Sequence, residues 1–183
     1  MAVSAICVSI LALELGGEPL KLLLRYDRDA LAGAELWRLL TGHVVHLGWS
    51  HALLDLAGLI LMWALFFGDY RPGYWLLIGA ASIAAIDAGF WFLEPQLAWY
   101  VGLSGMLHGV MSAGTWAHLR RRDWDAWILA AFLLAKLVWE QTHGALPLSG
   151  AGSQLRVVVD AHLFGAMGGL LAALWLRPNP RPL

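Results

Sequence analysis

Apolar stretches recur along almost the whole chain, and this pattern limits its possible folds more than any other feature. Of the 183 residues, 60% are hydrophobic and 14% are charged, whereas soluble domains carry about 25% charged residues. The mean hydropathy over the full length is +0.64. Because the apolar character is not confined to one segment, we expect an all-α membrane protein with several spans in contact with membrane lipids.

The charge balance and the length exclude further classes. The 12 basic and 13 acidic residues give a formal charge of −1, so no basic field is available for nucleic acid. At about 20 residues per span, the chain has room for six or seven crossings and none for a separate soluble domain. Any chemistry is therefore expected inside the helix bundle.

Turns and charged loops divide the chain into six expected spans within one domain, residues 1–183. Residues 16–49 form a long charged loop that is amphipathic enough to lie in the membrane interface. Ser50 is expected to cap the second span, and a Gly- and Pro-rich loop separates the fifth span from the sixth. The expected spans cover residues 1–15, 50–67, 74–93, 103–118, 124–140 and 157–176.

Basic residues in the short loops predict the orientation. Arg120, Arg121 and Arg122 follow the fourth span, and Arg177 and Arg181 follow the sixth. Because cytoplasmic loops are enriched in Lys and Arg, both termini are expected in the cytoplasm.

Polar residues within the spans are costly in lipid, so each is a candidate for function. His51 and Asp55 lie four residues apart on one face of the second span. Ser104 opens the fourth span, and His162 lies about one and a half turns into the sixth. With the expected topology, all four residues fall in the outer third of the membrane.

Glycine pairs predict which helices meet. Pairs four residues apart allow two membrane helices to approach closely. Such pairs occur on the fourth and sixth spans, at Gly105, Gly109, Gly165 and Gly169. If these faces pack together, the Ser104 hydroxyl reaches the His162 imidazole, as a nucleophile must reach its general base.

The same reasoning assigns the remaining polar residues. The backbone N–H of Ser104, with His51 and Asp55, is expected to stabilise an oxyanion. His108, on the same helix face as Ser104, is the rival base. Lys136 and Glu140 are expected to form a snorkelling pair. Asp160 is a poor partner for His162, His43 and His46 are expected to be structural or exposed to solvent, and Asp87 has no predicted partner.

These residues are similar to those of the rhomboid family of intramembrane serine proteases. Trp37-Arg38, His46, the segment from His51 to Asp55, Gly102-Leu103-Ser104-Gly105 and Ala161-His162 resemble the family's motifs. The resemblance implies a six-helix bundle that cleaves transmembrane proteins near the outer face. It also implies Ser104 as nucleophile, His162 as base, His51 in the oxyanion hole and no cofactor.

Within the family, the short length and the segments 102–109 and 157–162 look like the rhombosortase branch. That resemblance implies a multi-pass protein of the bacterial inner membrane, with substrates that carry a C-terminal Gly-Gly motif, a hydrophobic helix and a basic tail. It leaves open whether water or an amine resolves the acyl-enzyme.

One departure from the family pattern leaves alternatives open. The family has Asn where this chain has Asp55, and an ionised carboxylate repels an oxyanion. Either Asp55 is neutral and donates a hydrogen bond, or it pairs with a protonated His51. The alternatives to a protease are a catalytically silent relative that binds membrane helices and a metal site formed by His43, His46, His51 and Asp55.

Overall fold

The computed structural model describes residues 2–146 and 157–180. Part of the expected loop before the sixth span, residues 147–156, and the basic Arg181 lie outside these ranges.

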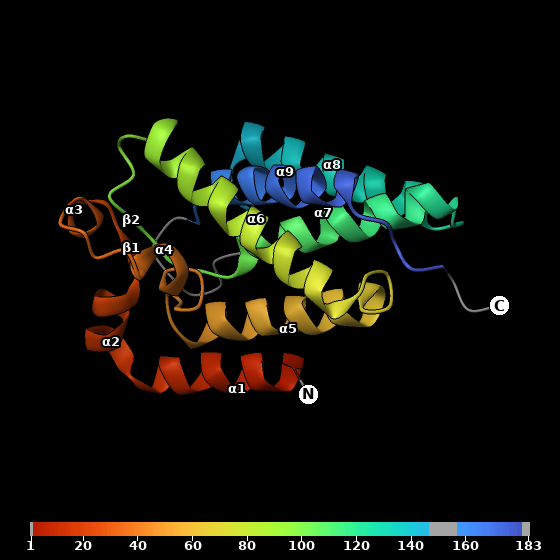
Figure 1. Cartoon of the computed structure of the whole chain (residues 1–183). Coiled ribbons are helices and arrows are strands. Elements are labelled where there is room, and N and C mark those ends of the chain that lie inside the picture. The colour runs from red at the N-terminus through yellow and green to blue at the C-terminus, as the bar shows by residue number, and fades with distance from the viewer. Residues whose placement is uncertain (1, 147–156, 181–183) are drawn as a thin grey trace.

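Six helices occupy the expected apolar ranges, and each begins and ends within a few residues of the prediction. Figure 1 shows α1 lying alongside α5, while α7 and α9 run side by side. α7 packs against α5, α6, α8 and α9 and is therefore the centre of the bundle. The six helices are α1 (Ala2–Leu15), α5 (Trp49–Phe66), α6 (Pro72–Phe92), α7 (Ser104–Arg121), α8 (Ala126–His143) and α9 (Asp160–Trp175).

The expected cap of the second span is wrong. α5 begins at Trp49, one residue before Ser50, and Gly48 occupies the capping position with a φ of 139°. Only glycine adopts this backbone conformation without strain, so the chain turns into the helix at Gly48. Ser50 already lies within the first turn.

Two helices, α5 and α6, are long and apolar enough on their own to cross a membrane. A third candidate combines residues of α1 with α2 (Gly17–Leu24), although the two helices are bent by 115°. α9 has only 16 residues, and α7 carries basic residues in its last turn. Length and composition therefore support two to three spans of the expected six.

The first loop is folded into short elements that gather at one end of the helices (Figure 1). Its residues form α2, β1 (Tyr26–Asp27), α3 (Arg28–Ala32) and α4 (Arg38–Thr41). The last carbonyls of α2 accept hydrogen bonds from Trp37, Arg38 and Thr41. These bonds satisfy carbonyls that the end of a helix leaves unpaired. Trp37 and Arg38 thus hold the loop together.

A two-stranded sheet connects this loop to the start of α7. β1 pairs with β2 (Trp99–Tyr100) in antiparallel register, with Tyr26 opposite Tyr100. Two residues after β2, the Gly102 N–H donates to the Gly42 carbonyl at 3.1 Å. The folded loop therefore fixes the backbone just before Ser104.

The predicted glycine faces pack on each other. A Cβ added to Gly165 would overlap the Gly105 carbonyl, and one added to Gly169 would overlap the Gly109 carbonyl. The backbones of α7 and α9 are therefore in direct contact, as in other close membrane helix pairs. This contact brings the start of α7 to the first turn of α9.

Charged residues join the elements at the opposite end of the bundle. An Arg121 nitrogen lies 2.6 Å from Asp69, which precedes α6, and His118 Nε2 lies 3.1 Å from the same carboxylate. The Asn179 N–H donates to the Asp69 carbonyl at 2.7 Å. The chain after α9 is therefore held against the turn between α5 and α6.

Candidate active site

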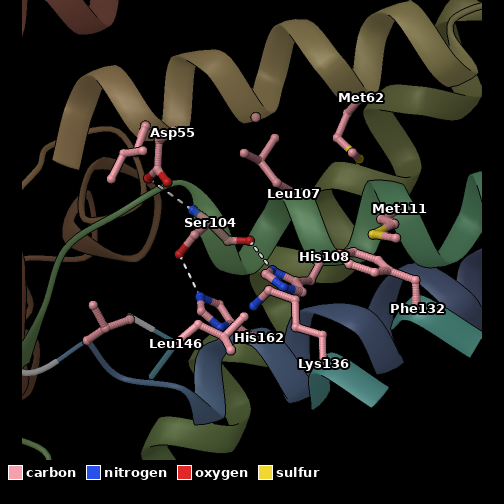
Figure 2. A pocket seen from close by; sticks show the side chains of 13 residues that line it. Asp55, Met62, Ser104, Leu107, His108, Met111, Phe132, Lys136, Leu146 and His162 are labelled. Atoms are coloured by element: carbon pink, nitrogen blue, oxygen red, sulfur yellow. Dashed lines mark hydrogen bonds between the residues drawn. The ribbon is translucent and has the colours of Figure 1, made fainter. Parts of the chain in front are cut away.

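Ser104 and His162 are joined across the contact between α7 and α9. Ser104 is the first residue of α7, and His162 lies in the first turn of α9 with 3% of its surface exposed. The Ser104 hydroxyl oxygen lies 2.8 Å from His162 Nε2. Figure 2 shows the two side chains facing each other at one end of a pocket. The glycine packing thus produces the contact that the sequence predicts.

The other nitrogen of His162 is hydrogen-bonded to Glu140, for which the sequence analysis predicted a different role. His162 Nδ1 donates to Glu140 Oε2 at 2.8 Å, and Glu140 is 1% exposed near the end of α8. Because a carboxylate only accepts, the proton of the neutral imidazole is on Nδ1. Nε2 is then free to accept the Ser104 hydroxyl proton.

The expected snorkelling role of Lys136 and Glu140 is therefore wrong. The two side chains do pair, at 2.5 Å, but Glu140 is fully buried and Lys136 lines the pocket beside Ser104. Helical periodicity cannot show which face of α8 contacts α9. The signal that could have indicated a buried contact was a carboxylate near the outer end of an apolar helix.

His108, the rival base, has a different position. Its Nδ1 donates to the Ser104 backbone carbonyl at 2.7 Å, and its ring stacks on His162 with centroids 4.1 Å apart. The stacked ring covers one face of the imidazole and restricts its rotation.

Asp55 caps α7 from the neighbouring helix. Its Oδ2 accepts hydrogen bonds from the N–H groups of Leu103 at 2.8 Å and Ser104 at 3.1 Å. A carboxylate is favourable at this position because the first N–H groups of a helix are unpaired and carry partial positive charge. The Ser104 N–H, expected to face an oxyanion, is thus bound to Asp55 in this structure.

His51 is oriented by the backbone. Its Nδ1 accepts the Leu47 N–H at 3.3 Å, so in the neutral ring the proton is on Nε2. Nε2 lies 3.6 Å from Asp55. The ring packs on Gly102, whose φ of 129° and lack of Cβ allow this approach. Burial raises the pKa of Tyr100, so its hydroxyl stays protonated and donates to the Gly102 carbonyl at 2.8 Å.

Of the two roles expected for His43 and His46, the structure supports the structural one, because the side chains are 0% and 1% exposed. His43 Nε2 lies 3.2 Å from Asp87, which supplies the partner that the sequence analysis could not identify. His46 Nε2 lies 3.1 Å from Asp55. These contacts tie the loop before α5 to α6 and α5.

The histidines and carboxylates of the described residues do not favour a metal ion. Of the four residues considered as ligands, His43 faces Asp87 and not Asp55. A second group, His108, Glu140 and His162, has ligand atoms within 4.8 Å of one another. The two rings are only 17° from parallel, so their in-plane lone pairs cannot both point at one ion about 2 Å away. A third group, His118, Asp123 and Asp125, belongs to the charged network at the opposite end.

Two cavities meet at Ser104. The larger, of about 370 Å³, is mostly apolar and lies between α5, α7 and α8, with Leu107, Met111 and Phe132 in its wall (Figure 2). The smaller, of about 260 Å³, is lined by His51 and the segment from Gln96 to Val101. An extended chain that passes Ser104 could therefore place side chains on both sides of the hydroxyl.

Together these features define a helical membrane protein with a hydrogen-bonded Ser–His pair in a cavity of the bundle. The model of the Rhomboid domain matches residues 33–179. The chain therefore belongs to the rhomboid family.

Individual relatives extend the match over nearly the whole chain. The chain is 25% identical over 177 residues to the rhomboid protease GlpG of Klebsiella pneumoniae, from strain ATCC 700721 / MGH 78578 and from strain 342. Each match covers 94% of this chain and 60% of the relative. The chain is also 26% identical over 141 residues to YdcA of Bacillus subtilis (strain 168). This match covers 77% of the chain and 67% of YdcA. The chain thus spans about three fifths of the length of the GlpG relatives.

Proposed function

We propose that the protein is a rhomboid-type intramembrane serine endopeptidase that cleaves transmembrane proteins near the outer face of the membrane. One observation carries this proposal: the Ser104 hydroxyl lies 2.8 Å from His162 Nε2, inside a cavity of the bundle. This is the distance at which a base can take the proton of its nucleophile.

The reaction follows from this contact. Ser104 Oγ attacks the substrate carbonyl carbon while its proton passes to His162 Nε2. The tetrahedral intermediate collapses, the C–N bond breaks, and His162 returns the proton to the leaving amine. A water molecule or an amine then attacks the acyl-enzyme by the reverse proton transfers.

The oxyanion of the intermediate is stabilised by His51 and by the Ser104 N–H. His51 Nε2–H is a donor whose ring lines the smaller cavity beside Ser104. The Ser104 N–H leaves Asp55 when substrate binds, because an oxyanion at this position needs the same donor. Asp55 keeps a contact with His46, whose Nε2 lies 3.1 Å from the carboxylate.

We further propose that all six long helices cross the membrane, with both termini in the cytoplasm and the site toward the outer face of a bacterial inner membrane. The outer faces of α8 and α9 support this topology, since Trp127, Leu134, Leu171 and Trp175 are all more than half exposed. Apolar side chains on such a surface are favourable in lipid and not in water.

The substrates are proposed to be those of the rhombosortase branch: proteins with a C-terminal Gly-Gly motif, a hydrophobic helix and a basic tail. The support is the segment from Gly102 to Gly109, in which His108 is stacked on the base, and the segment before His162.

Labelling with a fluorophosphonate probe tests the proposal. The purified parent in detergent should be labelled, Ser104→Ala and His162→Ala should not, and His108→Ala should keep labelling. A folded parent that takes up no probe favours the second candidate, a silent relative that binds membrane helices. Asp55 motivates that candidate, since its carboxylate binds the N–H that an oxyanion needs.

A further inference from the structure

Among residues 2–146 and 157–180, Glu140 is the one buried carboxylate in contact with the proposed base. Its two oxygens have separate partners, His162 Nδ1 at 2.8 Å and Lys136 Nζ at 2.5 Å. A buried carboxylate is costly unless it is paired and hydrogen-bonded. Both requirements are met here, by one residue from α9 and one from the preceding turn of α8.

This contact also joins two helices that otherwise touch little. α8 packs mainly on α7, while α9 packs on α7 and α6. The hydrogen bond between Glu140 and His162 therefore fixes the imidazole from the side opposite Ser104. With His108 stacked on the ring face, His162 is held on three sides.

We propose that Glu140 is a positioning residue that completes a Ser104–His162–Glu140 triad, with Lys136 holding the carboxylate in place. This inference rests on the proposed function. The role of Glu140 is to select the Nδ1–H tautomer of His162, which leaves Nε2 as the acceptor of the serine proton.

The proton transfers assign a second role to the same carboxylate. When the Ser104 proton reaches Nε2, His162 becomes an imidazolium and Ser104 Oγ forms its bond to the acyl carbon. The Nδ1 proton stays on His162, and the negative charge of Glu140 stabilises the cation. When the C–N bond breaks, the Nε2 proton goes to the leaving amine and the imidazole is neutral again.

Glu140→Gln separates these effects from simple packing, because the amide has nearly the shape of the carboxylate. We expect its maximal rate of fluorophosphonate labelling, kinact, to fall on the order of 10²- to 10⁴-fold. The probe concentration for half-maximal rate should be unchanged, because Glu140 does not line the pocket. Glu140→Asp, which restores a carboxylate on a shorter stem, should recover part of the rate.

Glu18→Gln is the matched control. Glu18 also pairs with a lysine one turn away, Lys21 at 2.5 Å, but it lies in α2 and is exposed. This variant should label at the parental rate. A common thermal unfolding midpoint in detergent for the parent and both Glu→Gln variants shows that the differences do not come from misfolding.

The tautomer can be read in the parent itself, and His162→Ala serves only to assign the signals. In nitrogen-15 NMR of histidine-labelled protein, the signals absent from His162→Ala should report a proton on Nδ1. Parental labelling by Glu140→Gln, or a proton on Nε2 in the resting parent, would overturn the triad while leaving the Ser–His pair intact. A folded parent that does not label refutes the proposed function instead, and the NMR result then decides only the geometry.

Discussion

Gly105→Ala tests whether the close contact of α7 and α9 sets the geometry of the site. A Cβ at this position would lie 2.9 Å from the Ala161 carbonyl oxygen, whereas ordinary contacts begin near 3.4 Å. The backbone of α9 cannot yield as a side chain can, so the helices must separate by about half an ångström (3.4 minus 2.9). Ser104 and His162 are on opposite sides of this contact.

The expected effect follows from that displacement. If it is transmitted to the site, the Ser104–His162 distance of 2.8 Å lengthens to about 3.3 Å, beyond the favourable range for a hydroxyl donor. A misplacement of about 1 Å costs about 100-fold in rate, so half of it should cost about tenfold. Overpacking should also lower the free energy of unfolding by about 1–3 kcal/mol.

The assay compares fluorophosphonate labelling rates and denaturant unfolding in detergent for the parent, Gly105→Ala and Gly73→Ala. Gly73 is the control because a Cβ there meets nothing within 4 Å, so Ala should change stability by no more than about 1 kcal/mol. If Gly105→Ala labels and unfolds like the parent, then the contact does not control the distance between Ser104 and His162.

Three further predictions concern residues around the site and at the far end of the bundle. Asp55→Asn should fold and keep activity within about tenfold, because an amide oxygen still accepts the Leu103 N–H, whereas Asp55→Ala should lose about 1–3 kcal/mol of stability. A folded but inactive Asp55→Asn would show that Asp does not merely substitute for Asn. Arg38→Ala should lower the free energy of unfolding by about 3 kcal/mol, because Arg38 is 7% exposed and its guanidinium donates to the Leu22 carbonyl. Arg38→Lys should not restore the stability, and thermal unfolding in detergent can check both variants. Burial raises the pKa of Asp69 above its ordinary value despite the opposing Arg121. The stability that Asp69 contributes is therefore complete below its pKa in the unfolded chain, about 4, and is lost as the pH rises through its pKa in the folded protein. Unfolding titrations from pH 4 to 7 should show this decline in the parent but not in Asp69→Asn.

Hydropathy and glycine spacing predicted the helices and the contact that forms the Ser–His pair. Both are local patterns, since an apolar stretch predicts its own helix and a glycine pair marks a surface for close packing. The partners of buried charges were harder to predict. Glu140 and Lys136 are spaced as an exposed pair would be, and only the packing of α8 distinguishes the two cases.

Asp55 illustrates the same limit. Its helical spacing from His51 was evident, but the N–H groups that it binds belong to Leu103 and Ser104 at the start of α7, 48 and 49 residues further along the chain. Likewise, the pair of His43 and Asp87 joins the first loop to α6 across 44 residues. Periodicity along one helix carries no information on such contacts.

The strand pair has a consequence for where this domain can be cut. The family match begins at residue 33, yet Tyr26 pairs with Tyr100, two residues before Gly102. A fragment trimmed to the family boundary would keep Ser104 and His162 but lose β1, α2 and the carbonyls that Arg38 binds. The smallest unit that preserves the site therefore begins before α2, and a fragment made for expression or grafting should start there.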